Sequence, residues 1–204
     1  ISFSQRIADL SALFKVKLTS LVVYSSMMAY LIGTSSFVLI DFVLLVVGGS
    51  LITFAANTLN QVLEKDYDKM MKRTAQRPLP QGRMTVSYAV LLAGFMSLIG
   101  ICALSVTNVW AGLLGMVSLI LYAFIYTPFK RISSISVLIG AIPGALPMSI
   151  GCVVAQGTIT PLAIALFAVQ FFWQFPHFWA IAFLGHEDYS NAGYKMLPSK
   201  SGEP

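Results

Sequence analysis

The length of the uncharged stretches constrains this chain more than any other feature. Residues 18–40, 42–63, 84–129 and 132–186 contain no Asp, Glu, Lys or Arg. A membrane-crossing helix needs roughly 20 mainly apolar residues, so these stretches have room for one, one, two and two spans. Only 10% of the residues are charged, against about 25% in a typical soluble domain. The sequence therefore predicts an all-α, polytopic transmembrane helical bundle with six spans.

Polar breaks divide the two longer stretches. Thr107-Asn108 interrupts the first, and Gln156-Gly157-Thr158, followed by Pro161, interrupts the second. A soluble protein would need helices with polar faces, which these runs lack. Residues 3–14 carry apolar side chains at helical spacing and predict an interfacial helix before the first span. The predicted spans are residues 18–36, 38–59, 85–106, 110–127, 134–155 and 160–184.

The basic residues all fall on one side of this arrangement. With six spans the loops alternate between the two sides, and the 13 Lys and Arg occupy the N-terminal segment, the loops 60–84 and 128–133, and the tail after 185. By the positive-inside rule, this side is the cytoplasm in a bacterial plasma membrane, or the matrix in a mitochondrial inner membrane. We expect one membrane domain over residues 1–204, with cytoplasmic acidic and basic catalytic loops at 60–84 and 185–204.

An acidic motif follows the second predicted span. Asn60, Glu64 and Asp68 stand at positions i, i+4 and i+8, so they share one face if the helix continues past the membrane edge. Two carboxylates and an amide oxygen suit Mg²⁺, which takes its other ligands from water and phosphate. Asp66 falls on the opposite face. Surface salt bridges on a solvated helix are the simpler interpretation, but most acidic residues lie at only two places beside the membrane.

The second acidic pair, Glu187 and Asp188, follows the sixth span on the same side. Two such clusters at one surface could bracket a pair of Mg²⁺ ions, and charge next to apolar helices is usually functional. Basic side chains surround them in sequence, and Arg is suited to bidentate contact with phosphate. The pattern therefore predicts a metal–diphosphate site. Its basic and tyrosine candidates are Lys72, Arg73, Arg77, Arg83, Tyr122, Tyr126, Lys130 and Arg131.

These motifs carry a family resemblance. Asn60-x₃-Glu64-x₃-Asp68, followed by Arg73-Thr74-x₂-Arg77-Pro78-Leu79-Pro80, resembles the first signature of the UbiA-type intramembrane prenyltransferases. The version here resembles the protoheme IX farnesyltransferase, or heme O synthase, branch. The segments similar to later motifs of that branch follow in order: 126–131, 140–147, 174–179 and 188–198.

Three departures accompany the resemblance. Gln61 and Glu64 stand where the generic aromatic prenyltransferases have Asp, and Lys15-Val16-Lys17 replaces a Lys-Pro-Arg element. The family has nine transmembrane helices against the six predicted here. We therefore expect a C-terminally truncated chain that lacks three helices which help to close the family's cavity.

The resemblance implies transfer of the farnesyl group of farnesyl diphosphate to a vinyl group of heme b, with Mg²⁺, to give heme O and diphosphate. It implies a metal site formed by Asn60, Glu64, Asp68, Glu187 and Asp188. It implies diphosphate contacts from Lys72, Arg73, Arg77, Tyr126, Lys130 and Arg131. His177 is the candidate heme contact, with a helix-packing histidine as the alternative. The expected partners are heme b, the lipid bilayer, and heme A synthase or the cytochrome oxidase assembly machinery, with no nucleic acid.

Other functions remain open from the sequence. The same fold could act on a quinone or another aromatic acceptor, although Glu64 and the histidine motif favour heme. A transporter would need charged groups near the bilayer midplane and broken helices, whereas only His177 and small polar residues lie deep in the predicted spans. A purely structural subunit would leave the two acidic loops unexplained.

Overall fold

The computed structural model describes residues 2–185, 188–189 and 193–194, and all regular structure in these residues is helical. Helices α5, η1 and α6 run into one another and form a single span, Val109–Phe129, so six helices are long and apolar enough to cross a membrane. The six-span prediction is confirmed. The elements are α1 (Phe3–Phe14), α2 (Val16–Gly33), α3 (Leu39–Asp68), α4 (Val86–Thr107), α5 (Val109–Ile120), the π-helix η1 (Leu121–Tyr126), α6 (Thr127–Phe129), α7 (Ser136–Gln156) and α8 (Pro161–Leu184).

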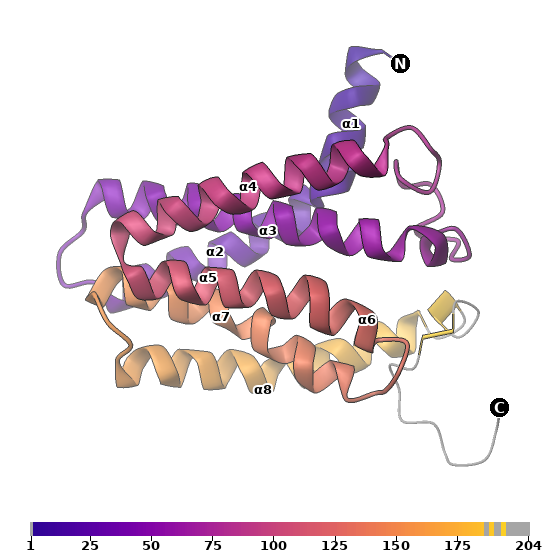
Figure 1. The fold of residues 1–204 in the computed structure, drawn as a ribbon. Helices are drawn as coiled ribbons and strands as arrows, with labels where there is room; N and C mark the ends of the chain where they lie inside the picture. The colour runs from indigo at the N-terminus through magenta and orange to yellow at the C-terminus, as the bar shows by residue number, and fades with distance from the viewer. Residues whose placement is uncertain (1, 186–187, 190–192, 195–204) are drawn as a thin grey trace.

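The spans lie side by side as a bundle in which successive helices reverse direction (Figure 1). The loop after α3, the turn after α6 and the segment after α8 all lie at the same end. Helix α7 is the most covered span and α8 the least. The described basic residues therefore gather at one end, as the spacing of the loops predicts.

Two helix ends differ most from the predicted spans, and the other boundaries lie within two residues of them. The first span ends at Gly33, before a polar Thr34 that caps it. The second helix does not stop near residue 59 but continues to Asp68. It continues because its polar residues are buried against neighbouring segments, so tertiary contacts extend the helix beyond its apolar part.

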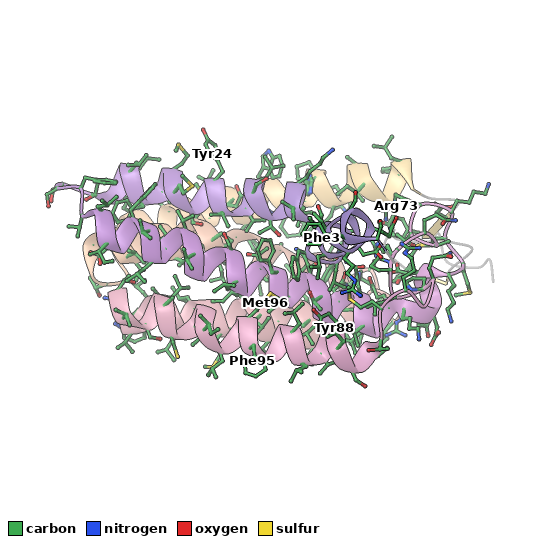
Figure 2. All side chains as sticks on the ribbon, turned by 90° about the horizontal axis from the view of Figure 1, so that it is seen from above. Phe3, Tyr24, Arg73, Tyr88, Phe95 and Met96 are labelled. Atoms are coloured by element: carbon green, nitrogen blue, oxygen red, sulfur yellow. The ribbon has the colours of Figure 1, made fainter. Side chains whose placement is uncertain are left out.

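The outer surface of the bundle is apolar over most of the length of the spans. Tyr24 and Phe95 project outward, whereas the neighbouring Met96 is buried (Figure 2). Phe172 and Phe183 on α8 are similarly exposed. A soluble monomer does not expose an apolar surface of this extent, so the exposed side chains indicate an integral membrane protein.

Small residues allow close helix contact inside the bundle. A Cβ atom on Gly151 of α7 would lie 2.0 Å from the Ser26 carbonyl oxygen of α2. A Cβ on Gly140 would lie 2.6 Å from the Tyr126 ring, and one on Gly144 would lie 2.8 Å from the Gln174 side chain. Close approach through small residues is the usual packing mode of membrane helices. Gly140 and Gly144 are therefore packing residues of α7.

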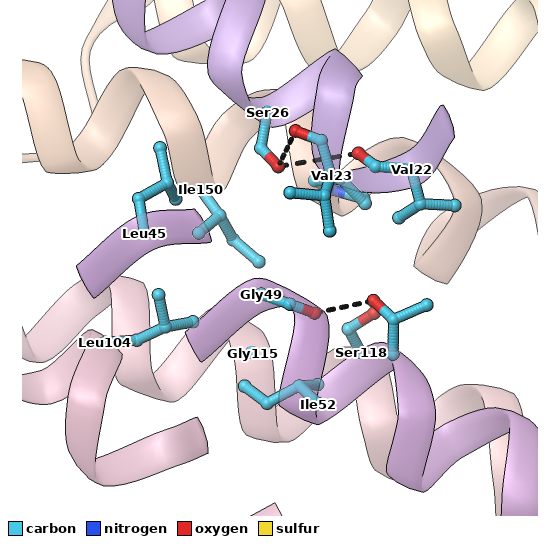
Figure 3. A pocket seen from close by; sticks show the side chains of 12 residues that line it. Val22, Val23, Ser26, Leu45, Gly49, Ile52, Leu104, Gly115, Ser118 and Ile150 are labelled. Atoms are coloured by element: carbon cyan, nitrogen blue, oxygen red, sulfur yellow. Dashed lines mark hydrogen bonds between the residues drawn. The ribbon is translucent and has the colours of Figure 1, made fainter. Parts of the chain in front are cut away.

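A small cavity lies inside the bundle between α2, α3, α4, α5 and α7 (Figure 3). Its volume of about 30 Å³ is on the scale of one or two water molecules. Ser26 and Thr53 at its wall donate hydrogen bonds to carbonyl oxygens of their own helices, at 3.1 Å to Val23 and 2.7 Å to Gly49. The cavity is too small for a prenyl chain, so the interior of the bundle at this depth is packed core.

Helix α1 leaves the bundle at a steep angle to the spans (Figure 1). Phe3 and Ile7 on it are exposed, while Leu13 and Asp9 are buried. A helix in this orientation with exposed apolar side chains matches the predicted interfacial helix over residues 3–14. Its junction with α2 is Lys15, which adopts a left-handed backbone conformation with φ of 48°.

Replacing Gly151 by Ala is expected to lower the free energy of unfolding by about 1–3 kcal/mol, because the new methyl group would overlap the α2 backbone. Gly94→Ala is the matched control, since no atom lies within 4 Å of a Cβ at that position, and this variant should be as stable as the unmutated chain or slightly more stable. Thermal unfolding in detergent micelles measures both. Equal melting temperatures would contradict the backbone contact.

Candidate active site

The polar end of α3 carries a row of buried side chains. Asn60, Glu64 and Asp68 are only 1%, 4% and 0% exposed. Asp66 on the same helix is mostly exposed and pairs with Lys69 at 3.1 Å. The three candidate residues thus share one inward-facing side of α3, as their spacing predicts, and Asp66 faces away.

Each buried carboxylate pairs with a basic side chain from another segment. Glu64 forms an ion pair with Lys130, which follows α6. Asp68 Oδ2 pairs with Arg77 Nη1 at 2.7 Å. The other oxygen, Asp68 Oδ1, is buried and has no hydrogen-bond partner among the described residues. The structure therefore brings together four of the predicted site residues and leaves one carboxylate oxygen available for a further ligand.

The π-helix η1 sets the position of Lys130. Its wider turn lets the Thr127 hydroxyl donate to the Tyr122 carbonyl oxygen at 2.8 Å, while the same hydroxyl accepts from Asn60 Nδ2 at 3.0 Å. Lys130 Nζ then lies 5.0 Å from the centre of the Tyr126 ring. Single π-helical turns inside α-helices are frequent at functional sites. Thr127 escaped the sequence analysis because a π-turn shifts the expected side-chain register.

Tyrosine rings lie against the other basic side chains. Arg131 Cζ is 4.3 Å from the centre of the Tyr67 ring. Arg73 donates a hydrogen bond to the Tyr189 hydroxyl at 3.1 Å. Contacts between cations and aromatic rings hold a charge while leaving its N–H groups free to bind an anion. Arg73 and Arg131, both predicted diphosphate contacts, thus lie against tyrosine rings.

Tyr194 closes the site from the segment after α8. It is buried, and its ring centre lies 5.5 Å from Lys130 Nζ. Burial raises the pKa of the Tyr194 hydroxyl, and the nearby negative charge of Glu64 raises it further. The phenol therefore stays protonated at neutral pH and remains a hydrogen-bond donor. No sequence signal singled out Tyr194, because its contact partners are far away along the chain.

Lys15 is a further basic residue of the site. Its Nζ donates to Asn60 Oδ1 at 2.8 Å, and the side chain is only partly exposed. Removal from water, together with the neighbouring charge of Arg77, lowers the pKa of this ammonium group to about 7. In the sequence, Lys15 stands out only as one of the basic residues on the predicted cytoplasmic side and as part of a departure from the family motif.

The remaining predicted residues are less involved. Lys72 is exposed, and among the described residues Asp188 does not group with Glu64 and Asp68 closely enough to hold a metal ion. Glu187 lies outside the described residues. His177 is exposed on α8, where its ring stacks on Trp173 with centroids 4.9 Å apart. The structure therefore joins the first acidic motif to the basic residues but does not bring Asp188 or His177 into that cluster.

The donor set fits a metal that is delivered with phosphate. In the described part of the chain, no three His, Cys, Asp or Glu side chains lie close enough together to hold a metal ion by themselves. Mg²⁺ commonly binds through one or two carboxylates and completes its shell with phosphate oxygens and water. Glu64 and the free Asp68 Oδ1 supply such a partial shell. Asn60 is less available, because Lys15 already contacts its side-chain oxygen.

The fold and site together define a polytopic helical membrane protein with a buried cluster of carboxylates and cations at one end. The chain belongs to the UbiA prenyltransferase family, which matches residues 21–204. It is 46% identical over 192 residues to a protoheme IX farnesyltransferase of Cytophaga hutchinsonii, covering 93% of this chain and 67% of that protein. The mitochondrial protoheme IX farnesyltransferase of Arabidopsis thaliana is 43% identical and covers 91% of this chain, which spans 44% of its length.

Solved structures share the fold at low sequence identity. A digeranylgeranylglyceryl phosphate synthase superposes with a TM-score of 0.81 at 16% identity, covering 95% of this chain and 68% of that one. A UbiA homologue from Archaeoglobus fulgidus, solved with DMAPP and Mg²⁺, gives a TM-score of 0.77 at 16% identity, covering 92% of this chain and 67% of that one. Likewise, the chain spans about two thirds of the length of the bacterial relatives it matches.

Removing Arg77 is expected to destabilise the chain more than removing the whole ion pair. Arg77→Met leaves the buried Asp68 carboxylate unpaired and should lower the free energy of unfolding by about 3 kcal/mol in EDTA. Adding Asp68→Asn should recover most of that loss. Chemical unfolding of the two single variants and the double variant measures the coupling. Additive effects would show that the pair does not contribute to stability.

Proposed function

We propose that this protein transfers the farnesyl group of farnesyl diphosphate to a vinyl group of heme b, giving heme O and diphosphate with the help of Mg²⁺. The observation that carries the proposal is the buried pairing of Glu64 with Lys130 and of Asp68 with Arg77. Carboxylates suit the metal, and the cations suit the diphosphate. Relatives named protoheme IX farnesyltransferase, at 40–46% identity, support farnesyl as the group transferred and heme as the acceptor.

The basic side chains would bind and orient the diphosphate. Lys130 and Arg77 match the two carboxylates in the cluster, and Arg73 and Arg131 add positive charge nearby. Glu64 and Asp68 would hold Mg²⁺, as the metal bound with DMAPP in the Archaeoglobus homologue suggests. When bound, Mg²⁺ supplies electrostatic stabilisation of the charge that develops on the departing diphosphate. The excess of positive charge supports an anionic leaving group.

The reaction breaks the bond between C1 of the farnesyl group and the diphosphate oxygen, and that oxygen keeps the electron pair. The vinyl π electrons of heme b form the new bond to C1. Water then adds to the resulting cation and loses a proton, which leaves the hydroxyl group of heme O. Tyr126 lies beside Lys130, and its ring centre is 5.6 Å from that of Tyr122. Their π faces would stabilise positive charge on the allylic group once the diphosphate departs.

The proposal also includes the orientation of the site in the membrane, the place of the farnesyl chain, the partners and the heme contact. The charged end of the bundle would face the cytoplasm of a bacterium, or the matrix in a mitochondrion, because the basic loops gather there. The apolar faces of the spans would hold the farnesyl chain away from the water that would quench an allylic cation. Association with heme A synthase or the oxidase assembly machinery is part of the same proposal, since heme O must pass to the next enzyme. His177, on the exposed face of α8, remains the proposed heme contact.

Heme O formation tests the proposal directly. Membranes containing the protein are incubated with heme b, farnesyl diphosphate and Mg²⁺, and the hemes are separated by chromatography and identified by mass. The Glu64→Gln, Asp68→Asn double variant should lose at least about 100-fold in rate, because it removes both proposed metal-binding carboxylates.

Asp66→Asn is the matched control, because Asp66 lies on the same helix but is exposed, and its rate should stay within about two-fold of the unmutated rate. Full heme O formation by the double variant would refute the metal assignment. Transfer of farnesyl to a quinone precursor in place of heme b would refute the acceptor.

A further inference from the structure

The Lys15 side chain contacts the site at Asn60. Its ammonium group donates to Asn60 Oδ1 at 2.8 Å. An ammonium group can only donate hydrogen bonds, so the contact fixes which end of the Asn60 amide points toward Lys15. The Asn60 NH₂ group then donates to Glu64 Oε2 at 2.9 Å and to Thr127 Oγ1 at 3.0 Å.

The backbone around Lys15 is held in place independently of its side chain. Gln61 Nε2 donates to the Ala12 and Leu13 carbonyl oxygens at 3.1 and 2.7 Å. Asn57 Nδ2 donates to the Phe14 carbonyl oxygen at 3.2 Å. These carbonyls belong to the last turn of α1, where a helix leaves four acceptors without internal partners. The amides of α3 thus dock the end of α1 beside the site.

A second anchor joins α1 to the loop that carries Arg77. Asp9 is buried and forms an ion pair with Arg83 at 3.0 Å. The left-handed backbone at Lys15 then turns the chain from α1 into α2. The backbone that carries Lys15 to Asn60 is therefore held by α3 and by Arg83.

We infer that Lys15 is a positioning residue, which orients the Asn60 amide so that Asn60 donates to Glu64 and holds that carboxylate for the divalent metal. Asn60 then serves as a support of Glu64, because its only side-chain oxygen is occupied by Lys15. This inference deepens the proposed function and rests on it for turnover, but metal binding tests it separately. Supporting partners of a metal-binding carboxylate typically change metal affinity by about 10–100-fold.

The test uses the full chain in lipid nanodiscs, with Mn²⁺ as the probe and its binding followed by electron paramagnetic resonance. Lys15→Met should weaken Mn²⁺ binding about ten-fold, because the Asn60 amide loses the hydrogen bond to its oxygen and supports Glu64 less firmly. Simple electrostatics predicts the opposite sign, since removing a nearby cation should tighten the binding of a metal cation. Binding by Lys15→Met that is equal to or tighter than that of the unmutated chain would overturn the inference.

Three further variants separate positioning from misfolding and from a general charge effect. Lys17→Met removes an exposed cation two residues away and should bind Mn²⁺ like the unmutated chain. Lys15→Arg retains the donor and should recover most of the affinity. In an Asn60→Ala background, Lys15→Met should cause no further loss, because Lys15 acts through Asn60. An additional ten-fold loss in that background would contradict the assigned route.

Two outcomes distinguish this inference from the proposed function. If Lys15→Met lowers the Mn²⁺ affinity of a chain that forms no heme O, the proposed reaction is refuted and the positioning role of Lys15 is retained. An unmutated chain that binds no Mn²⁺, even with inorganic diphosphate added, would overturn both. In turnover, Lys15→Met should raise the Mg²⁺ concentration needed for half-maximal rate, and excess Mg²⁺ should restore most of kcat.

Discussion

Two carboxylates at the end of α3, those of Glu64 and Asp68, are buried where the helix bundle meets its loops, and each is paired with a cation from another segment. An unpaired charge in such a place would strongly destabilise the fold. The position of Lys130 after the π-helix and that of Arg77 in the loop after α3 therefore depend on these carboxylates. A further contact holds the loop after α3: the Thr74 hydroxyl donates a hydrogen bond to the Asp68 carbonyl oxygen at 2.9 Å.

The pairs also relate stability to the proposed chemistry. A complex of Mg²⁺ with diphosphate contains both partners that the site needs, a cation for the carboxylates and an anion for Lys130 and Arg77. Its binding would therefore exchange one set of satisfied charges for another, without leaving a buried charge alone. Cation–π contacts with the tyrosine rings hold Lys130 and Arg131 in place without using their N–H groups as hydrogen-bond donors.

Helix α1 belongs to the site as well as to the membrane surface. Its exposed apolar side chains face outward, while its last carbonyl groups accept hydrogen bonds from Asn57 and Gln61. Polar residues within a membrane helix are otherwise costly, and here they donate to carbonyl groups at the end of α1. These contacts satisfy the amides of α3 and bring Lys15 to Asn60.

Local pattern in the sequence determined the six spans, the gathering of basic residues at one end, and the shared face of Asn60, Glu64 and Asp68. These features follow from apolar length and the helical period, which each segment encodes by itself. The tertiary structure alone decided which cation pairs with which carboxylate, and it alone placed Lys15, Thr127 and Tyr194 at the site. Those contacts join segments that are distant along the chain, and they depend on a π-turn, a left-handed residue and close helix packing that no local period reveals.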